Sequence, residues 1–410
     1  MSFPFHIFDV FGIELEYMIV NKDTLDVLPI TDKVIEAESG QISSEIELGD
    51  IAWSNELVLH VIELKTNGPV KSLSGLSNKF LSNINRINNI LDKMNGCLMP
   101  TAMHPWMNPL TETHLWPHEY SPIYEAYNKI FGCKGHGWSN LQSTHINLPF
   151  GNDDEFAKLH SGIRLILPIM PALTASSPII ESKITGFLDS RMIAYSNNSA
   201  KIPSIAGKII PERAFSQNEY SSMIFEKMYK DINTFDTEGI LQHEFLNSRG
   251  AIARFDRGAI EIRVLDIQEC PQADIALAGL IISAIASLAA EKWIPLKEQM
   301  KWEVDPLSEI FKNVVKNGHN AVINNSEYLN IFGLNSKSIT AGELWMHISS
   351  LSEPIAGIDD SMEKAKAIIL KNGCLAQRIL DAHGKDFRKE RIKEVYNNLC
   401  SCLQNGVSFV

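Results

Sequence analysis

The stretch from Ala251 to Pro271, AIARFDRGAIEIRVLDIQECP, constrains the fold of this chain more than any other. Apolar residues alternate in it with Glu261 and Arg263, and a period of two predicts a β-strand. On a strand these two charged side chains point to the same face. Arg254 and Arg257 precede them closely. The stretch therefore predicts a sheet surface with several arginines and a carboxylate, although a salt-bridged, exposed strand would give the same pattern.

A second strand with charged residues on one face is predicted from Val10 to Val20. Its alternation places Glu14 and Glu16 on one face. Two carboxylates at adjacent same-face positions repel each other unless a cation lies between them, and a divalent cation is the usual solution. The alternative is a solvated edge strand with two independent glutamates, but the apolar neighbours favour a central strand.

Two more predicted strands carry residues of the same chemistry. The first runs from Leu57 to Leu64 and is bracketed by Glu56 and Glu63. Because these glutamates are seven positions apart, a strict strand would place them on opposite faces, so either a bulge intervenes or Glu56 lies in the loop before the strand. The second runs from Leu141 to Leu148.

On that second strand His145 and Asn147 share a face and could present a metal ligand and an amide to one pocket. A single histidine is often only a satisfied core residue. Arg191 is expected in a loop after a helix, where its guanidinium could hold a carboxylate through two hydrogen bonds. A surface arginine is an equally good interpretation. His104, His114 and His118 lack the spacing of a zinc site, so an ordered loop near the active-site mouth is predicted over residues 99–127.

The remaining segments predict helices that pack on the sheet. Apolar residues recur at helical spacing from Ser72 to Asn95 and from Asp153 to Ala175, the latter interrupted by two prolines. Further helices are predicted after Ile275 and over Ser308–Asn317, Ala341–Ser350, Asp360–Asn372 and Phe387–Gln404.

Charge and composition exclude several classes of protein. Acidic residues (49) outnumber basic ones (37), and the net charge of −12 argues against nucleic-acid partners and against an anionic membrane surface. The apolar run from Ile275 to Ala290 is shorter than the ~20 residues that span a bilayer, so it predicts a core helix. Six scattered cysteines form no disulfide framework, and the N-terminus lacks the pattern of a signal peptide. The cytoplasm is the expected compartment.

The charged residues of the four predicted strands suggest one shared site. A cluster of carboxylates cannot stay ionised in a partly buried site without cations. Carboxylates with one histidine suit Mg²⁺ or Mn²⁺, and Mg²⁺ held in this way commonly also binds substrate phosphates. Neighbouring arginines would neutralise a transferred phosphoryl group. Because the chain contains no GxxxxGK[ST] or GxGxxG motif, the sequence predicts ATP-dependent chemistry without a P-loop.

Five motifs in the first two thirds of the chain resemble the glutamate–cysteine ligase family (family 2 type), carboxylate–amine ligases of the glutamine synthetase superfamily: GIELEY, NELVLHVIELKTNGP, LQSTHINLPFG, TASSP…TGFLDSR and RGAIEIRVLD. The resemblance implies an α+β fold in which a curved antiparallel sheet forms a funnel-like active site and is backed by helices. We expect a catalytic sheet domain over residues 1–300 and a helical C-terminal extension over residues 301–410 packed on it.

The resemblance also implies roles for individual residues. Arg263, with Arg254 or Arg257, would stabilise the phosphoryl transition state. Arg191 would hold the amino-acid carboxylate, and Gln142 and Asn147 are further expected substrate-binding residues. Many bacterial relatives carry an H-x-H pattern where this chain has His145 and Asn147, and Asn147 is closer to the pattern of ligases that take glutamate and cysteine. The expected metal ligands are Glu14, Glu16, Glu56, Glu63, His145 and Glu261.

The expected function is an ATP-dependent ligase that joins the γ-carboxylate of glutamate to an amine such as cysteine through an acyl phosphate, as in glutathione biosynthesis. Mg²⁺ or Mn²⁺ and ATP are the expected cofactor and co-substrate. Small molecules are the expected partners, and a homo-oligomer is compatible with the sequence. Two alternatives remain: a guanidino-type phosphotransferase, and a non-catalytic protein that binds a nucleotide or an amino acid on the same scaffold.

Overall fold

An eight-stranded antiparallel sheet forms the centre of the computed structural model, which describes residues 3–386 and 388–410. The strand order is β2-β3-β4-β1-β6-β10-β9, and β5 also pairs with β1. The strands are β1 (Gly12–Asn21), β2 (Glu45–Leu48), β3 (Ile51–Asn55), β4 (Val61–Thr66), β5 (Gly96–Met99), β6 (Ser143–Pro149), β9 (Ala251–Arg254) and β10 (Ala259–Asp266). Two small hairpins, β7 (Ile179–Ile180) with β8 (Lys183–Ile184) and β11 (Val322–Ile323) with β12 (Ile339–Thr340), lie outside this sheet.

Helices that include α2 and α11 cover one face of the sheet, and α4 lies on the opposite face. The helices up to residue 289 are α1 (Thr31–Ser39), α2 (Leu76–Asp92), α3 (Pro109–Glu112), α4 (Ser121–Phe131), α5 (His136–Ser139), α6 (Asp153–Ile166), α7 (Pro171–Thr174), α8 (Ser190–Asn197), α9 (Gln217–Tyr220), α10 (Glu226–Ile232) and α11 (Pro271–Ala289). The rest are α12 (Leu296–Gln299), α13 (Val304–Asn317), α14 (Ser326–Ile331), α15 (Ala341–Leu351), α16 (Asp360–Asn372), α17 (Leu375–His383) and α18 (Lys389–Asn405). An antiparallel sheet backed by helices confirms the predicted fold class.

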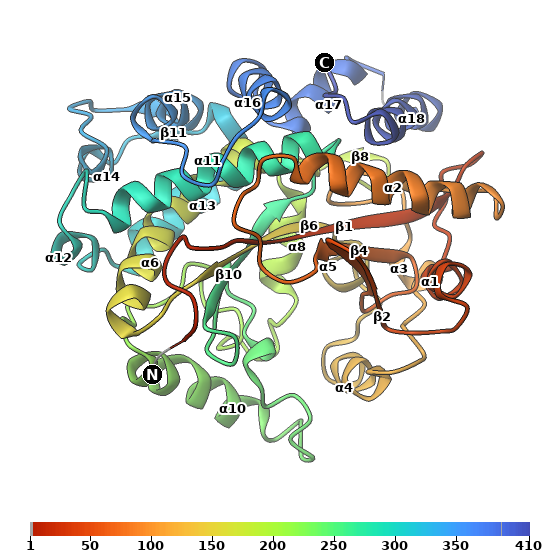
Figure 1. The fold of residues 1–410 in the computed structure, drawn as a ribbon, viewed down its shortest axis with the longest axis horizontal. Helices are drawn as coiled ribbons and strands as arrows, with labels where there is room; N and C mark the ends of the chain where they lie inside the picture. The colour runs from red at the N-terminus through yellow and green to blue at the C-terminus, as the bar shows by residue number, and fades with distance from the viewer. Residues whose placement is uncertain (1–2, 387) are drawn as a thin grey trace.

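The helices form two layers on this face (Figure 1). α2 and α11 lie next to the sheet, α15 and α16 lie beyond α11, and α18 contacts both α2 and β5. α2 buries the predicted apolar stripe that includes Phe80, Ile84 and Leu91. Among the described residues, α11 is the one helix long and apolar enough to cross a membrane, but 94% of its apolar window is buried inside the protein. It packs against α2, α6 and α16, as the predicted core helix.

The central strand β1 separates the apolar core from the opposite face. Ile13, Leu15 and Tyr17 are fully buried, and they belong to the core shared with the α2 and α11 side chains. Glu14 and Glu16 alternate with them and therefore point away from that core. Further along the same face, Met18 and Val20 are covered by apolar residues of α17 and α18. The C-terminal helices thus close one end of the polar face.

Two predicted strands differ in the structure. The stretch from Ala251 divides into β9 and β10, joined by a turn at which Gly258 has a φ of 64°. A Cβ at this glycine would meet the ring of Phe3 at 2.5 Å, so the turn requires glycine. The strand predicted over Leu57–Leu64 begins only at Val61, as β4, because residues 56–60 form the connection from β3. Glu56 lies in this connection before β4, as one of the two interpretations predicted.

The C-terminal helices share the core of the sheet. α13, α15, α16 and α18 correspond to the four helices predicted after residue 300, whereas α14 and α17 were not predicted. The predicted start of the last helix, Phe387, lies outside the described residues. A single apolar cluster extends from Phe11, just before β1, to Leu403 on α18. The division into a catalytic domain and an extension at residue 300 therefore stays a prediction.

Candidate active site

A cavity of about 480 Å³ lies on the polar face of the sheet. Its floor is built by β1, β4, β6 and β10, and its walls include α4 and the β9–β10 hairpin. All but two of the predicted site residues line it: Glu14, Glu16, Glu56, Glu63, His145, Arg191, Arg254, Arg257, Glu261 and Arg263. Residues from five separate stretches of the chain thus meet in one hollow.

Strand register explains this convergence. Glu14 lies directly opposite His145 on β6, and Glu16 lies opposite Glu63 on β4. Glu261 on β10 lies opposite Asn147 on β6. Residues that are directly opposite in an antiparallel pair share a face, so the alternation along each strand carries every one of these side chains to the cavity side.

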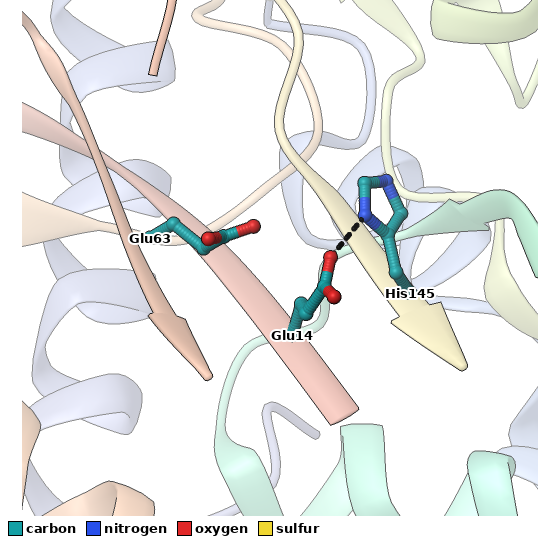
Figure 2. Close-up of side chains that lie close together, drawn as sticks. All are labelled: Glu14, Glu63 and His145. Atoms are coloured by element: carbon teal, nitrogen blue, oxygen red, sulfur yellow. Dashed lines mark hydrogen bonds and ion pairs between the residues drawn. The ribbon is translucent and has the colours of Figure 1, made fainter. Parts of the chain in front are cut away.

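Hydrogen bonds fix Glu14 and His145 against each other (Figure 2). His145 Nδ1 lies 2.9 Å from Glu14 Oε2, and Asn147 Nδ2 donates to Glu14 Oε1 at 3.0 Å. Burial alone would raise the pKa of Glu14, but the hydrogen bond from His145 lowers it to about 2. Burial alone would lower the pKa of His145, but its bond to Glu14 and the charge of Glu16 raise it to about 9. The two side chains form an ion pair.

The other carboxylates are crowded. Ser143 donates to Glu16 Oε2 from its backbone N at 2.6 Å and from its Oγ at 2.8 Å, while Ser54 Oγ donates to Glu63 Oε2 at 2.5 Å. Burial and the charge of Glu14 raise the pKa of Glu63 to about 7. Burial and the charges of Glu16 and Glu63 raise the pKa of Glu56 well above its ordinary value. Raised pKa values of this kind result when buried carboxylates are packed close together.

Two groups of three side chains have the geometry to hold a metal ion. Glu14, Glu63 and His145 form one group, and Glu16, Glu56 and Glu63 form the other; within each, the ligand atoms lie within 4.8 Å of one another. Figure 2 shows Glu14 and His145 in contact, with Glu63 on the next strand turned toward them. Carboxylate oxygens with a single imidazole fit Mg²⁺ or Mn²⁺. Glu63 belongs to both groups.

Arginines hold Glu261 at the other side of the cavity. Its Oε1 accepts from Arg263 Nε at 3.1 Å, and its Oε2 lies 3.5 Å from Arg254 Nη1. Burial alone would raise the pKa of Glu261, but the charge of Arg263 holds it below its ordinary value. Glu261 lies outside both three-ligand groups. The side chain of Arg257, in the β9–β10 turn, is 60% exposed at the cavity rim.

Of the three residues predicted to bind substrate, one is buried in the cavity wall and two do not line the cavity. Arg191 lies in the first turn of α8, not in a loop, and is 1% exposed. Its Nε donates to Asp266 and both of its Nη atoms donate to the Arg263 carbonyl at 3.3 Å. Gln142 is fully buried and does not line the cavity. Asn147 also does not line it, and its amide is bonded to Glu14. Substrate contacts by these residues stay a prediction.

Several lining residues were not predicted. Lys65 is two positions after Glu63 on β4 and therefore shares its face. The alternation of this strand could have predicted Lys65 as a lining residue. The predicted loop over residues 99–127 gives way to α4, which contributes Tyr124 and Tyr127 to the wall beside Trp138. Tyr127 and Trp138 are in ring contact, with centroids 5.3 Å apart. Only the folded chain brings these aromatic residues over the sheet.

The three histidines near residue 110 do not form a metal group within the described residues. His104 is buried, and its Nε2 lies 2.7 Å from the Leu25 carbonyl. His118 Nε2 lies 3.1 Å from Asp32.

Comparisons with known proteins identify the family of this chain. Residues 10–326 match the glutamate–cysteine ligase family 2. An uncharacterized protein of Archaeoglobus fulgidus is 36% identical over 270 residues, which are 66% of this chain and 72% of that protein. A protein of Enterobacter sp. (strain 638), provisionally named glutamate–cysteine ligase 2, is 24% identical over 303 residues and 72% of each chain.

The fold is similar to that of a solved ligase. The crystal structure of glutamate–cysteine ligase from Francisella tularensis in complex with AMP aligns with a TM-score of 0.63 at 15% identity, covering 98% of this chain and 90% of that one. At this identity the likeness concerns the fold alone.

Proposed function

Because the chain belongs to the glutamate–cysteine ligase family 2, a family of carboxylate–amine ligases, we propose that it uses ATP to join the γ-carboxylate of glutamate, or of a related acid, to an amine such as cysteine. One observation carries this proposal. A single cavity places two three-ligand groups of metal-binding character beside the arginines of the β9–β10 hairpin. Such an arrangement can hold the triphosphate of ATP and stabilise the transfer of its terminal phosphoryl group.

The residues present fit Mg²⁺ or Mn²⁺. Glu14, Glu63 and His145 would hold one ion, and Glu16, Glu56 and Glu63 would hold another. When bound, the ions would neutralise the phosphate oxygens and polarise the bond to the transferred phosphoryl group. The raised pKa of Glu63 is compatible with this assignment, because closely packed, buried carboxylates need additional positive charge for all of them to be ionised.

The reaction proceeds in two transfers. An oxygen of the acid's carboxylate attacks the γ-phosphorus of ATP, the bond to the ADP oxygen breaks, and an acyl phosphate forms. Arg263, with Arg254 or Arg257, stabilises the charge on the phosphoryl oxygens. The amine nitrogen then attacks the acyl carbon, the bond to phosphate breaks, the nitrogen loses a proton, and the products are an amide and inorganic phosphate. The chain contributes positioning and charge.

Other features support small-molecule substrates. The wall formed by Tyr124, Tyr127 and Trp138 offers apolar surface opposite the charged floor. A hydrophobic lining with a few fixed polar groups is typical of small-ligand sites. The AMP bound to the Francisella tularensis ligase, which has the same fold, supports a nucleotide as the co-substrate here.

A double substitution tests the proposal. Glu14→Gln with Glu16→Gln keeps the size of both side chains but removes two negative charges from the cavity floor. We expect the wild type to release ADP and phosphate only when acid, amine and Mg²⁺ are all present. The variant should release neither, with an unchanged circular dichroism spectrum. Glu390→Gln with Glu394→Gln, both exposed on α18, is the matched control and should retain full activity.

Two results would count against the proposal. Turnover that survives the Glu14 and Glu16 substitutions would remove these residues from the chemistry. ADP formation with one substrate alone, and no released phosphate, would instead identify a phosphotransferase.

A further inference from the structure

Lys65 lies in the floor of the cavity, and the reaction described above does not use it. It is on β4, opposite Glu14 on one side and opposite the small side chain of Ala52 on the other. Its side chain is 26% exposed. It is the one lysine among the described residues that line the cavity, and it faces the site from the side opposite the arginines of β9 and β10.

Carboxylates surround the Lys65 ammonium. Its Nζ lies 2.6 Å from Glu45 Oε2 and 3.4 Å from Glu63 Oε2. A third carboxylate, that of Glu14, belongs to the residue directly opposite Lys65 on β1. Two carboxylates in contact with one compact positive charge, and a third on the neighbouring strand, resemble the surroundings of a bound metal ion.

Lys65 also determines which oxygen of Glu63 is free. Ser54 Oγ donates to Glu63 Oε2 at 2.5 Å, and the Lys65 ammonium approaches the same oxygen. Both partners of this carboxylate therefore engage Oε2 and leave Oε1 for ions in the two three-ligand groups. Such outer contacts orient the ligand carboxylates of metal sites.

We propose that Lys65 is a positioning residue whose ammonium takes the place of a further divalent ion among Glu45, Glu63 and Glu14. The cavity then binds one ion fewer than its carboxylates could hold, and one positive centre is present at any concentration of divalent cation. This inference rests on the proposed function, because it assumes that the neighbouring carboxylates bind metal.

Counting bound ions tests the inference without an activity assay. Purified full-length protein, stripped with a chelator, is titrated with Mn²⁺, and the free ion is measured by electron paramagnetic resonance. Lys65→Ala leaves room among the three carboxylates, and we expect it to bind one more Mn²⁺ than the wild type. Lys65→Arg keeps the charge and should bind the wild-type number. Combining Lys65→Ala with Glu45→Gln should abolish the additional ion.

The outcomes separate the inference from the proposed function. If the wild type binds Mn²⁺ and Lys65→Ala binds the same number, the inference is wrong and the proposed function stands. If neither protein binds Mn²⁺, both are wrong. Thermal unfolding monitored by circular dichroism verifies the fold of each variant, and Lys65→Ser replaces Lys65→Ala if the alanine variant does not fold.

Discussion

The amide of Asn147 holds a carboxylate that faces the cavity. Its Nδ2 donates to Glu14 Oε1, and Gly12, directly opposite on β1, lets it approach, because a Cβ at Gly12 would meet Asn147 Cβ at 3.0 Å. Asn147 therefore orients Glu14 from outside the cavity. Partners of metal ligands contribute strongly to metal affinity even when they never contact the ion.

Removing this amide should weaken metal binding. We expect Asn147→Ala to lower the Mn²⁺ affinity by about 10–100-fold, because Glu14 loses the donor that orients it. Isothermal titration calorimetry measures the change. Asn67→Ala is the control, since Asn67 is exposed and donates to the Gly49 carbonyl instead. An Asn147→Ala affinity equal to that of the control would show that Glu14 is oriented without this bond.

A buried acid under the sheet makes stability depend on pH. Asp274, in the first turn of α11, accepts from Thr144 Oγ1 at 2.6 Å and from the Gln268 backbone N at 3.0 Å. Burial raises its pKa from 3.8 to about 8. Between these values the folded protein keeps a proton that the unfolded chain releases. The contribution of Asp274 to stability is therefore lost as the pH rises toward 8.

The variant Asp274→Asn should remove this dependence. The asparagine keeps an oxygen acceptor for Thr144 and Gln268 but does not titrate. We expect the free energy of unfolding of the variant, relative to the wild type, to rise steadily from pH 5 to pH 8. Urea denaturation at pH 5, 6.5 and 8 measures it. Parallel pH curves for the two proteins would contradict the prediction.

Single residues also show how far the sequence determines the site. Alternation alone places Glu14, Glu16, His145 and Glu261 on the correct faces, because the side-chain period of a strand is two. Lys65 shares that alternation with Glu63, but its partner Glu45 comes from β2, a strand that was not predicted. The bond from Asn147 to Glu14 depends on β6 pairing with β1, which a single sequence does not reveal.

At the scale of elements, the β9–β10 hairpin concentrates positive charge beside the carboxylates. Its strands and turn carry Arg254, Arg257 and Arg263. Arg254 and Arg263 are bonded to Glu261, whereas Arg257 contacts only the nearby Asp256 at 3.8 Å in the described ion pairs. The three arginines should therefore differ in their effects on catalysis.

Substitutions in the hairpin should separate binding from chemistry. We expect Arg257→Gln to raise the KM for ATP with little change in kcat. Arg263→Gln should lower kcat by about 10²–10³-fold, because a donor aimed at developing charge is lost. Steady-state kinetics measure both effects. Arg86→Gln, an exposed arginine of α2, is the control. Equal effects of the Arg257 and Arg263 variants on kcat would contradict this division.

The same hairpin shows where sequence patterns fail for elements. The alternation from Ala251 onward is continuous enough to predict one strand, yet Gly258 turns the chain. A bulge between Ile262 and Leu265 then shifts the register with β6. Turns of this kind depend on a single residue, and bulges depend on the partner strand. Long helices such as α2 and α11 were predicted more closely, because their apolar spacing extends over several turns.

At the scale of the whole molecule, a buried ion pair ties the C-terminal helices to the catalytic sheet. Arg378 on α17 donates to both oxygens of Glu269, at 2.6 and 3.2 Å, just after β10. It also donates to the Phe409 carbonyl, and the Phe409 backbone N donates to Glu269 at 3.2 Å. The end of the chain is thereby fixed beside the segment that leads from β10 into α11.

Breaking this pair should destabilise the entire protein. Arg378→Met leaves Glu269 buried without a cation, and the expected loss in the free energy of unfolding is about 3–5 kcal/mol. Urea denaturation measures it. Arg388→Met removes an arginine that pairs with Asp386 at the surface and should have no measurable effect. A loss confined to the C-terminal helices, seen as a separate unfolding transition, would indicate an independent extension.

One face of β1 packs in the core and the other lines the cavity, and this limits how the length of the chain can change in evolution. An insertion or deletion of one residue within Gly12–Asn21 would carry Glu14 and Glu16 beneath α11 and expose Ile13 and Leu15 to the substrates. Such an event destroys the core and the chemistry together, so no gradual route leads through it. We therefore expect changes of length in the connections that flank the strand rather than within β1 itself.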